Sequence, residues 1–511
     1  FAKLEKSWAE HTRYIEQAQE EIVPLAEDAM QALAKQVSVE GRRIVVFNPL
    51  PWSRDGVVRM KSSDTSCSAL QPVEGGGVAP VWMDGNELCF VARDIPPMGY
   101  RTFVPADATK SQNDLRGDAA TGVIENEFLK VTLDPKRDGI RSVIDKRTGR
   151  ELVDLDSGYA FGQYLYERFD ANQVASYVRA YVKNDSDWAQ AELGKPAMPP
   201  ASTISYRAAS PRCESVDITE SPVSISAQMH ASPTADISHA VTTRVILSAG
   251  EPYIDLEVTL HDKPADNWPE AGWICLPVNA DEPQFRLGRL GGIADPARDF
   301  VRGSNRDVQA IHTGLTIADR QGRGVGICPI DNPLASLDRP GLWRYSRDFV
   351  PHKPIAFVNL FNNQWTTNFR LWNESTWTAR VRLWAFDRFD ARSSLITPSL
   401  EARYPLLATA GEGKAGTLPP TSAGLEISAR GTLVTAFGPN PDGSGIVLRL
   451  WEYAGVAGPC KVRLPQLLNI GEVQPVNLRG EPTGTPLPVE KGEFTVNLAA
   501  FAPASFVIRN P

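Results

Sequence analysis

The sequence predicts a mainly β protein that begins with a short N-terminal helical segment. From Arg42 onward, apolar runs rich in β-branched residues are separated by glycine, proline, asparagine and aspartate. Residues 253–260 alternate between apolar and polar side chains, which is the pattern of an antiparallel strand with one buried face. No strand–helix–strand alternation is visible, which argues against a parallel α/β barrel in this chain.

Residues 1–37 are predicted to form an amphipathic helix. Their apolar side chains recur at spacings of three and four, which places them on one stripe. The members of this stripe are Leu4, Trp8, His11, Ile15, Ala18, Ile22, Leu25, Ala29 and Leu33. Pro24 is expected to kink or split the helix. A stripe of this length needs a partner, so we expect it to pack on helices outside this chain.

Shifts in composition predict five successive parts of the chain. They are a helical segment at 1–37, a small β-sandwich at 38–105, a linker at 106–120, a large β domain at 121–395 and a C-terminal β domain at 396–511. The predicted strands are 42–47, 56–60, 123–133, 242–247, 253–260, 355–361, 379–386, 445–452 and 505–509.

Composition excludes several classes of function. The chain has 511 residues, with 53 Lys and Arg against 61 Asp and Glu, giving a net charge of -8. Without a dense basic block, nucleic acid is not an expected partner, and no apolar run is long enough to span a membrane. The six cysteines are scattered without a C-x-x-C pair, so we expect free thiols and no zinc ligation by them.

Several short motifs follow one another along the chain. They are IVVFNPLPW at 44–52, DIPPMGY at 94–100 with RTF at 101–103, IENEFLK at 124–130, VTLDP at 131–135, GIRS at 139–142, DKRTGRE at 145–151 and GIVLRLWEYAG at 445–455. In this order they resemble the C-terminal half of glycoside hydrolase family 38, the α-mannosidases. The block at 124–151, which resembles the opening of the family's large β domain, is the most specific.

This resemblance implies a fold and an activity for the parent protein. It implies that the large β domain is a galactose-mutarotase-like supersandwich with flanking smaller β-sandwich domains. It also implies that residues 1–37 are the end of a three-helix bundle. The parent would be a retaining, zinc-dependent α-mannosidase whose catalytic N-terminal barrel is absent from this chain, so that barrel is one expected partner.

The residues that would carry catalysis cannot be assigned here. Retaining glycosidases use two carboxyl groups roughly 5–5.5 Å apart, and the family's zinc ligands include a His-x-Asp pair. None of the six histidines is followed at the second position by Asp. We therefore expect no cofactor on this chain, zinc in the missing N-terminal domain, and no activity from this chain alone.

The segment NLFNNQWTTN at 359–368 is the first candidate sugar-binding site. Asn362, Asn363, Trp365 and Asn368 follow directly on an apolar strand. Amide groups bind sugar hydroxyls, and aromatic faces pack against the C–H surface of a sugar. The alternative is an asparagine-stabilised hairpin around a buried tryptophan.

The segment RPGLWRYSRD at 339–348 is the second candidate. The resemblance implies that loops of the β domain reach over the barrel and contribute to the substrate pocket, which makes Trp343, Arg344, Tyr345 and Arg347 candidates for its rim. An arginine beside an aromatic ring is equally well explained as a stacked structural pair.

Three functions compete at this stage. The chain is the β region of an α-mannosidase-like hydrolase, a stand-alone carbohydrate-binding protein without enzymatic activity, or a sugar epimerase acting through its own sandwich. The lone histidines make the third the weakest. The expected ligand is a mannoside-like glycan or glycoside. The compartment stays open, with a soluble bacterial protein of the cytoplasm or periplasm expected.

Overall fold

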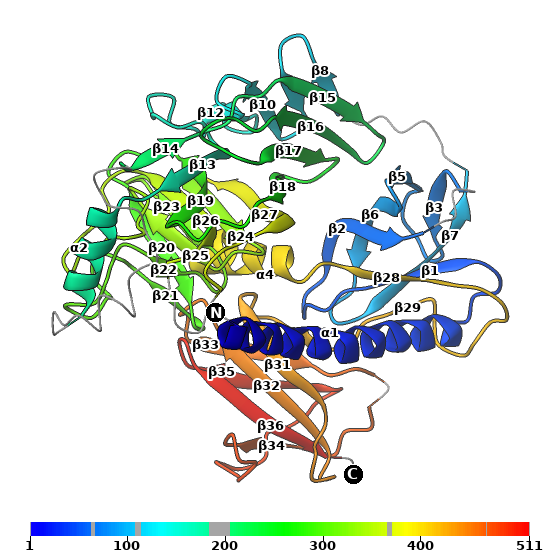
Figure 1. Cartoon of the computed structure of the whole chain (residues 1–511). Helices are drawn as coiled ribbons and strands as arrows, with labels where there is room; N and C mark the ends of the chain where they lie inside the picture. Colours follow the sequence, from blue (N-terminus) through cyan, green and yellow to red (C-terminus); the bar gives the residue numbers. More distant parts are fainter. Residues whose placement is uncertain are drawn as a thin grey trace.

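The computed structural model describes residues 2–62, 67–107, 114–182, 205–364, 370–466 and 468–509. A long helix lies beside a small sandwich, a large sandwich and a C-terminal sandwich, all built from antiparallel pairs of strands (Figure 1). The prediction of a mainly β fold with a large sandwich and smaller flanking ones is confirmed. Among the described residues, no helix has both the length and the apolar character that a bilayer crossing requires.

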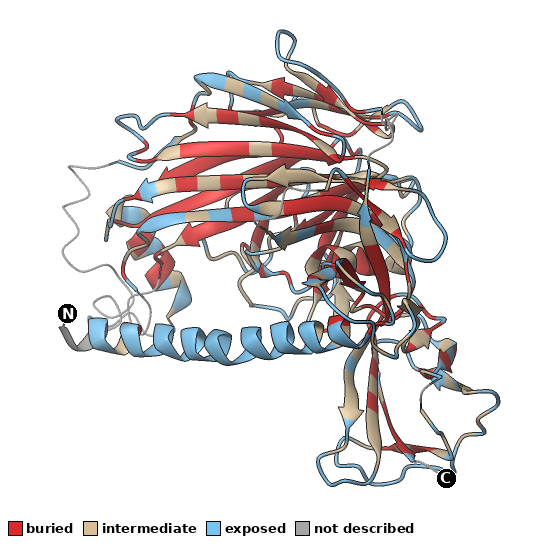
Figure 2. Ribbon diagram, turned by 90° about the vertical axis from the view of Figure 1, so that its right-hand side faces the viewer, coloured by how far each residue is buried: buried red, intermediate tan, exposed pale blue. Residues whose placement is uncertain are grey.

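Helix α1, Ala2–Gln36, is one helix of 35 residues. The expectation that Pro24 splits this segment is wrong. Pro24 lies in an exposed stretch, where water can satisfy the carbonyl group that the missing N–H leaves free. Trp8 is buried near the start, and Ala34 packs with Val37 and Val45 near the end. Figure 2 shows that the long middle of α1 is exposed.

The small sandwich combines a six-stranded and a three-stranded sheet. The first contains β1 (Arg43–Phe47), β3 (Ala69–Pro72), β4 (Ala79–Pro80), β7 (Tyr100–Ala106), β28 (Leu407–Gly411) and β29 (Thr421–Ser422). The second contains β2 (Arg54–Lys61), β5 (Trp82–Asp84) and β6 (Glu87–Ile95). Strands β28 and β29 come from the predicted C-terminal domain but pair with β1 and β7. Composition cannot reveal such a long-range pairing, so the boundary at 396 differs from the structure.

The large sandwich has three sheets. The five-stranded sheet contains β8 (Arg116–Asp118), β9 (Val123–Glu125), β10 (Leu129–Asp134), β11 (Gly139–Asp145) and β12 (Arg150–Glu151). The six-stranded sheet contains β13 (Gln163–Arg168), β14 (Arg207–Ala209), β19 (Glu270–Pro277), β22 (Gln309–Ala310), β25 (Leu334–Leu337) and β26 (Ile355–Asn362). The nine-stranded sheet contains β15 (Ser215–Glu220), β16 (Ser224–Ala231), β17 (Ala240–Ser248), β18 (Tyr253–Lys263), β20 (Gln284–Arg289), β21 (Gly292–Ala294), β23 (Leu315–Ala318), β24 (Gly324–Pro329) and β27 (Ser375–Phe386).

The linker predicted at 106–120 ends inside this sandwich. Leu115 is buried in the core, and β8 pairs with β9 at the edge of the five-stranded sheet. The polar residues Arg116–Asp118 are the exposed residues of this edge strand.

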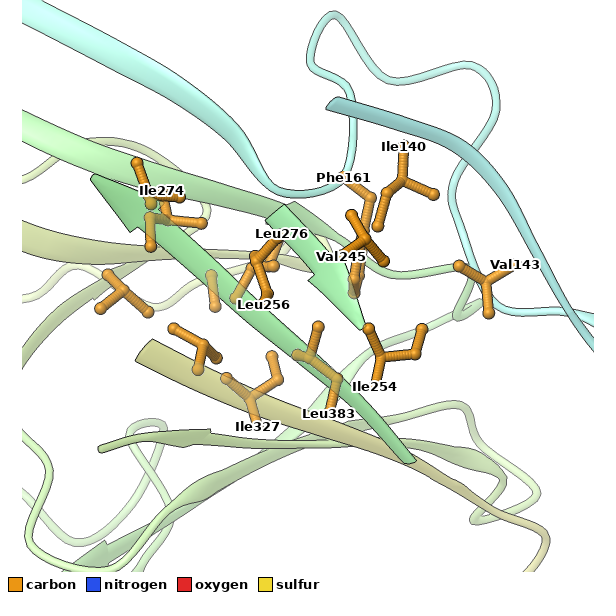
Figure 3. Close-up of a cluster of buried hydrophobic side chains, with 14 of the residues drawn as sticks. Ile140, Val143, Phe161, Val245, Ile254, Leu256, Ile274, Leu276, Ile327 and Leu383 are labelled. Atoms are coloured by element: carbon orange, nitrogen blue, oxygen red, sulfur yellow. The ribbon is translucent and has the colours of Figure 1, made fainter. Parts of the chain in front are cut away.

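The core of the large sandwich lies between its sheets. Ile254, Leu256, Val258 and Leu260 of β18 are all at most 3% exposed, which confirms the alternation predicted from the sequence. Side chains from all three sheets meet there, including Ile140, Leu256, Ile274 and Leu383 (Figure 3). The six cysteines are free thiols, as predicted.

The C-terminal sandwich and the short helices complete the fold. The sandwich contains β30 (Glu426–Ile427), β31 (Thr432–Pro439), β32 (Ile446–Glu452), β33 (Gly458–Arg463), β34 (Glu472–Val476), β35 (Glu493–Leu498) and β36 (Pro503–Arg509). Within the described residues, the other helices are α2 (Ala171–Tyr181), η1 (Ala391–Ile396) and α4 (Thr397–Arg403).

Candidate functional site

The outer face of the six-stranded sheet carries the candidate site. Along β13 and β19, alternate side chains point into the sandwich core or to this outer face. Tyr164 and Ile274 belong to the core, whereas Leu165 and Trp273 belong to a second apolar cluster. Helix α2 and the loop at 338–354 supply further members of that cluster, so both segments cover the outer face of the sheet.

An aromatic patch lies where helix α2 meets this loop. We define the aromatic patch as Tyr177, Tyr181, Trp343, Tyr345 and Arg347. The ring of Tyr177 stacks on Tyr181 with centroids 5.9 Å apart and stands edge-on to Trp343 at 5.5 Å. Tyr345 touches both tyrosines, at 6.3 and 6.0 Å. The guanidinium of Arg347 lies over the Tyr345 ring at 5.6 Å.

Helix α2 positions the two tyrosines of the patch. Its start is fixed by a capping box in which Asp170 accepts from the backbone N–H of Gln173, while Gln173 accepts from that of Asp170. Tyr177 and Tyr181 are four residues apart and therefore share one face of the helix. The sequence reasoning missed this helix. The D-x-x-Q pattern at 170–173 was the signal that could have revealed it.

A buried carboxylate lies beneath this region. Glu167 is 2% exposed and accepts hydrogen bonds from the Tyr206 hydroxyl and from Trp273 Nε1, both at 2.7 Å. Burial raises the pKa of Glu167, and the two hydrogen bonds and the charge of Arg344 oppose that rise. Glu167 fixes the orientation of Tyr206, whose side chain is 39% exposed.

The structure places the four predicted residues of the loop differently from one another. Tyr345 is half-buried in the patch, and Arg347 is exposed and donates to the carbonyl of Ala180 at 3.3 Å. Arg344 is exposed and donates from Nε to Pro340. Trp343 is only 4% exposed among the other rings of the cluster. The faces of Trp343 are therefore used in packing, and its contact with sugar stays a prediction.

The segment after β26 reaches the same patch. Gln364 is 6% exposed and its side chain hydrogen-bonds Tyr177. Asn362 is half-buried and donates to Asn359 Oδ1 at 2.8 Å. Trp365 and Asn368 lie outside the described residues. The two segments that the sequence singled out thus converge on Tyr177.

Asn363 has a structural role instead of the predicted sugar contact. It is 2% exposed, and its Nδ2 donates to the carbonyls of Asp266, Trp268 and Leu371. Its Oδ1 accepts from the backbone N–H of Glu270 at 2.9 Å. Both amide hydrogens are used, so the side chain closes a turn and cannot donate to a ligand.

A polar junction next to Asn363 ties the two large sheets together. Lys263 Nζ lies 2.5 Å from Glu270 Oε1, and both side chains are almost fully buried. Lys263 also donates to the carbonyl of Asn373 at 2.9 Å, and Asn373 Nδ2 donates to that of Asn362. Trp372 stands edge-on to Trp8 of α1, with centroids 5.7 Å apart. The start of α1 therefore lies against the loop that borders Asn362.

No metal centre is formed by the described side chains. In that part of the chain, no three His, Cys, Asp or Glu residues are grouped to share an ion. His239 contacts Tyr164 at 3.0 Å, and His261 contacts Thr242 at 2.8 Å, so each bonds a hydroxyl group. The family resemblance implies zinc in an N-terminal barrel, and the described residues of this chain form no group of ligands for it. The patch offers ring faces and a guanidinium, with the amides of Asn362 and Gln364 nearby, and such groups can contact a sugar.

Comparison with known proteins agrees with this architecture. The family model of the glycosyl hydrolases family 38 C-terminal beta sandwich domain matches residues 432–502. A protein in glycosyl hydrolase family 38 from Enterococcus faecalis aligns with 94% of this chain at TM-score 0.65 and 13% identity. An α-mannosidase from Enterococcus faecalis V583 aligns with 94% at TM-score 0.66 and 14% identity.

Two further comparisons gave a weaker match and no match. A galactose mutarotase-like protein from Lactobacillus casei ATCC 334 aligns with 52% of this chain at TM-score 0.29 and 11% identity. No curated protein sequence matches the chain.

The chain spans 60% and 58% of the two Enterococcus faecalis structures. At this level of identity the likeness concerns the fold, and residues 432–502 match the family by sequence as well. The resemblance seen in the motifs is thus confirmed: the chain is similar to the C-terminal portion of a glycosyl hydrolase family 38 protein.

Proposed function

We propose that this chain is the C-terminal β region of a retaining α-mannosidase-like glycoside hydrolase. In this role it supports the fold of the parent protein and helps to form the sugar pocket. The catalytic barrel and its zinc would lie on polypeptide that precedes α1. The convergence of the segments at 343–347 and 362–364 on Tyr177 is the observation that carries the contribution to the pocket.

The character of α1 supports a preceding domain. Ile15, Ile22 and Leu25 are 72%, 64% and 69% exposed, an arrangement that is costly in water unless another surface covers them. Trp8 lies against Trp372, so a domain joined to the start of α1 would stand near Asn362 and the aromatic patch. The proposed function requires that domain as a partner. A mannoside-like glycan is the expected ligand of the parent protein.

Hydrolysis of an aryl α-mannoside by the parent protein and by this chain, each with and without zinc, tests the proposal. We expect zinc-dependent activity in the parent and none in this chain. The coding sequence upstream of Phe1 should also encode a barrel with a His-x-Asp pair. Hydrolysis by this chain alone would refute the proposal that catalysis belongs to the barrel.

The second candidate function is carbohydrate binding without catalysis. It is favoured because Tyr181 and Arg347, the exposed members of the aromatic patch, are present on this chain without a contribution from another domain. Calorimetric titration of the chain with mannose separates the two. If the chain binds mannose and its reading frame begins near Phe1, the stand-alone role is supported. If a barrel is encoded upstream of Phe1, the hydrolase is supported.

A further inference from the structure

A cleft of about 220 Å³ opens where the small sandwich meets the large one. Pro72, Val78 and Arg101 line it from the small sandwich, and Pro222 and Val223 line it from the turn before β16. No Asp or Glu is among the residues that line it in the described part of the chain. The cleft is therefore walled mainly by apolar groups, with guanidinium groups as its charged component.

Arg101 is the unusual member of this lining. It is only 7% exposed, and its guanidinium is held by the carbonyls of Arg93, Glu74 and Gly75 at 2.9, 2.6 and 2.7 Å. Its buried Nε–H has no hydrogen-bond partner.

The charge of Arg101 is also poorly compensated. Its carboxylate neighbour Asp94 lies 3.8 Å away, and the Asp94 side chain is 84% exposed to water. The other arginine of the cleft, Arg93, pairs closely with Asp55 at 2.8 Å and lies 3.6 Å from Glu251. Because buried charges are normally paired, the preorganised guanidinium of Arg101 is suited to an added anion.

We propose that this cleft binds a small organic carboxylate. The carboxylate would pair with the guanidinium of Arg101, and the apolar body of the ligand would pack against Pro72, Val78 and Pro222. Ligand sites usually combine apolar walls with a few polar groups, at volumes of roughly 300–1,000 Å³. The smaller volume here limits the ligand to about the size of an aromatic acid. This inference is independent of the proposed function, because other elements build the aromatic patch.

The glycines at 75–77 provide the means of testing it. A Cβ atom on Gly76 would lie 3.1 Å from both Arg101 Nη2 and Pro72 Cγ, so Gly76 gives the loop its close approach. At Gly77 a Cβ atom would meet nothing within 4 Å, and the backbone is not in the left-handed region. Gly77→Phe can therefore add a side chain at the cleft while Arg101 stays in place. Gly158, which also has open space and an ordinary backbone, supplies the matched control Gly158→Phe.

The experiment is calorimetric titration of the whole chain with benzoate, benzyl alcohol and inorganic phosphate. We expect benzoate to bind at least about tenfold more tightly than benzyl alcohol, as a charge-assisted hydrogen bond requires. Gly77→Phe should weaken benzoate binding by about tenfold or more, and Gly158→Phe should not. Arg101→Met should abolish the preference for benzoate over benzyl alcohol, with thermal unfolding reporting whether the loop at 74–75 survives.

The opposite results would overturn the proposal. Equal binding of benzoate and benzyl alcohol, or no saturable benzoate binding, would remove the role of Arg101. Unchanged affinity in Gly77→Phe would place any binding outside this cleft. Tighter binding of phosphate than of benzoate would show that the apolar wall plays no part, and that the ligand class is wrong.

Discussion

Lys263 at the end of β18 and Glu270 at the start of β19 form an ion pair of 2.5 Å that joins the nine-stranded sheet to the six-stranded sheet. Glu270 also accepts from the Tyr166 hydroxyl at 2.7 Å, and its backbone N–H donates to Asn363. Burial raises the pKa of Glu270, and Lys263 opposes that rise. The pair therefore holds the end of β18 against the start of β19, close to the point where the chain leaves β26.

Removing one partner of this pair should be strongly destabilising. Lys263→Met leaves Glu270 buried without its cation, which should lower the free energy of unfolding by about 3–5 kcal/mol. The double variant Lys263→Met with Glu270→Gln should recover part of that loss, because no unpaired charge remains. Urea denaturation measures both values.

An exposed ion pair provides the control for this prediction. Arg13 and Glu20 lie 2.8 Å apart on the exposed part of α1. Arg13→Met should leave the free energy of unfolding almost unchanged, because water screens an exposed pair. Equal losses in Lys263→Met and Arg13→Met would contradict a structural role for the buried pair.

Glu251 should make the stability of the chain depend on pH. Burial raises the pKa of Glu251 to about 7, although Arg93 and Arg382 lower it. A carboxyl group whose pKa is raised on folding stabilises the folded state fully below its unfolded pKa of roughly 4.3, and this contribution is lost as the pH rises through 7. Between pH 4 and pH 7 the loss should be on the order of 3 kcal/mol.

The variant Glu251→Gln isolates this contribution. It cannot ionise, so its free energy of unfolding should fall less than that of the wild type between pH 4 and pH 7. Asp138, whose pKa burial also raises to about 7, titrates in both proteins and cancels in the comparison. Parallel stability curves for the variant and the wild type would show that Glu251 does not titrate in this range.

The sequence predicted strands well where burial of one face shapes the local pattern. Period-two alternation marked β18 because burial on one face imposes that pattern directly. Helix α2 was missed because it is short and lies between strands, and β28 was assigned to the wrong domain because its partner β1 is more than 350 residues away in sequence.

Within the candidate site, residue types alone did not show which side chains are buried and which are exposed. Asn363 and Trp343 have the chemistry of sugar-binding residues, yet one closes a turn and the other fills a core. A buried and an exposed asparagine can have the same kinds of neighbours in the sequence. Only the fold distinguishes the two. Tyr177 and Glu167 could not be predicted as residues of the site, because a tyrosine or a glutamate in an ordinary stretch of sequence gives no signal of its own.

The exposed tyrosine of the aromatic patch should contribute to sugar affinity. Tyr181 is 44% exposed and stacks on Tyr177, so part of its ring faces solvent at the edge of the patch. Tyr181→Ala should weaken binding of mannose several-fold, in line with about 0.5–1.5 kcal/mol for an aromatic contact. Calorimetric titration measures the affinity. Tyr404→Ala, at a tyrosine that is 40% exposed elsewhere, is the control and should leave affinity unchanged.

The exposed side of α1 should reveal whether a preceding domain covers it. In this chain alone, Ile22→Ser with Leu25→Ser should change the free energy of unfolding by no more than about 0.5 kcal/mol, because both side chains already face water. In the parent protein the same pair should cost about 1.5–3 kcal/mol for each side chain that becomes buried. Val37→Ser, at a fully buried position, should destabilise both proteins and serves as the control. Thermal unfolding of the four variant proteins, compared with the two wild types, makes the test. If the double variant is as harmless in the parent as in this chain, no domain packs on this side of α1 and the proposed arrangement is wrong.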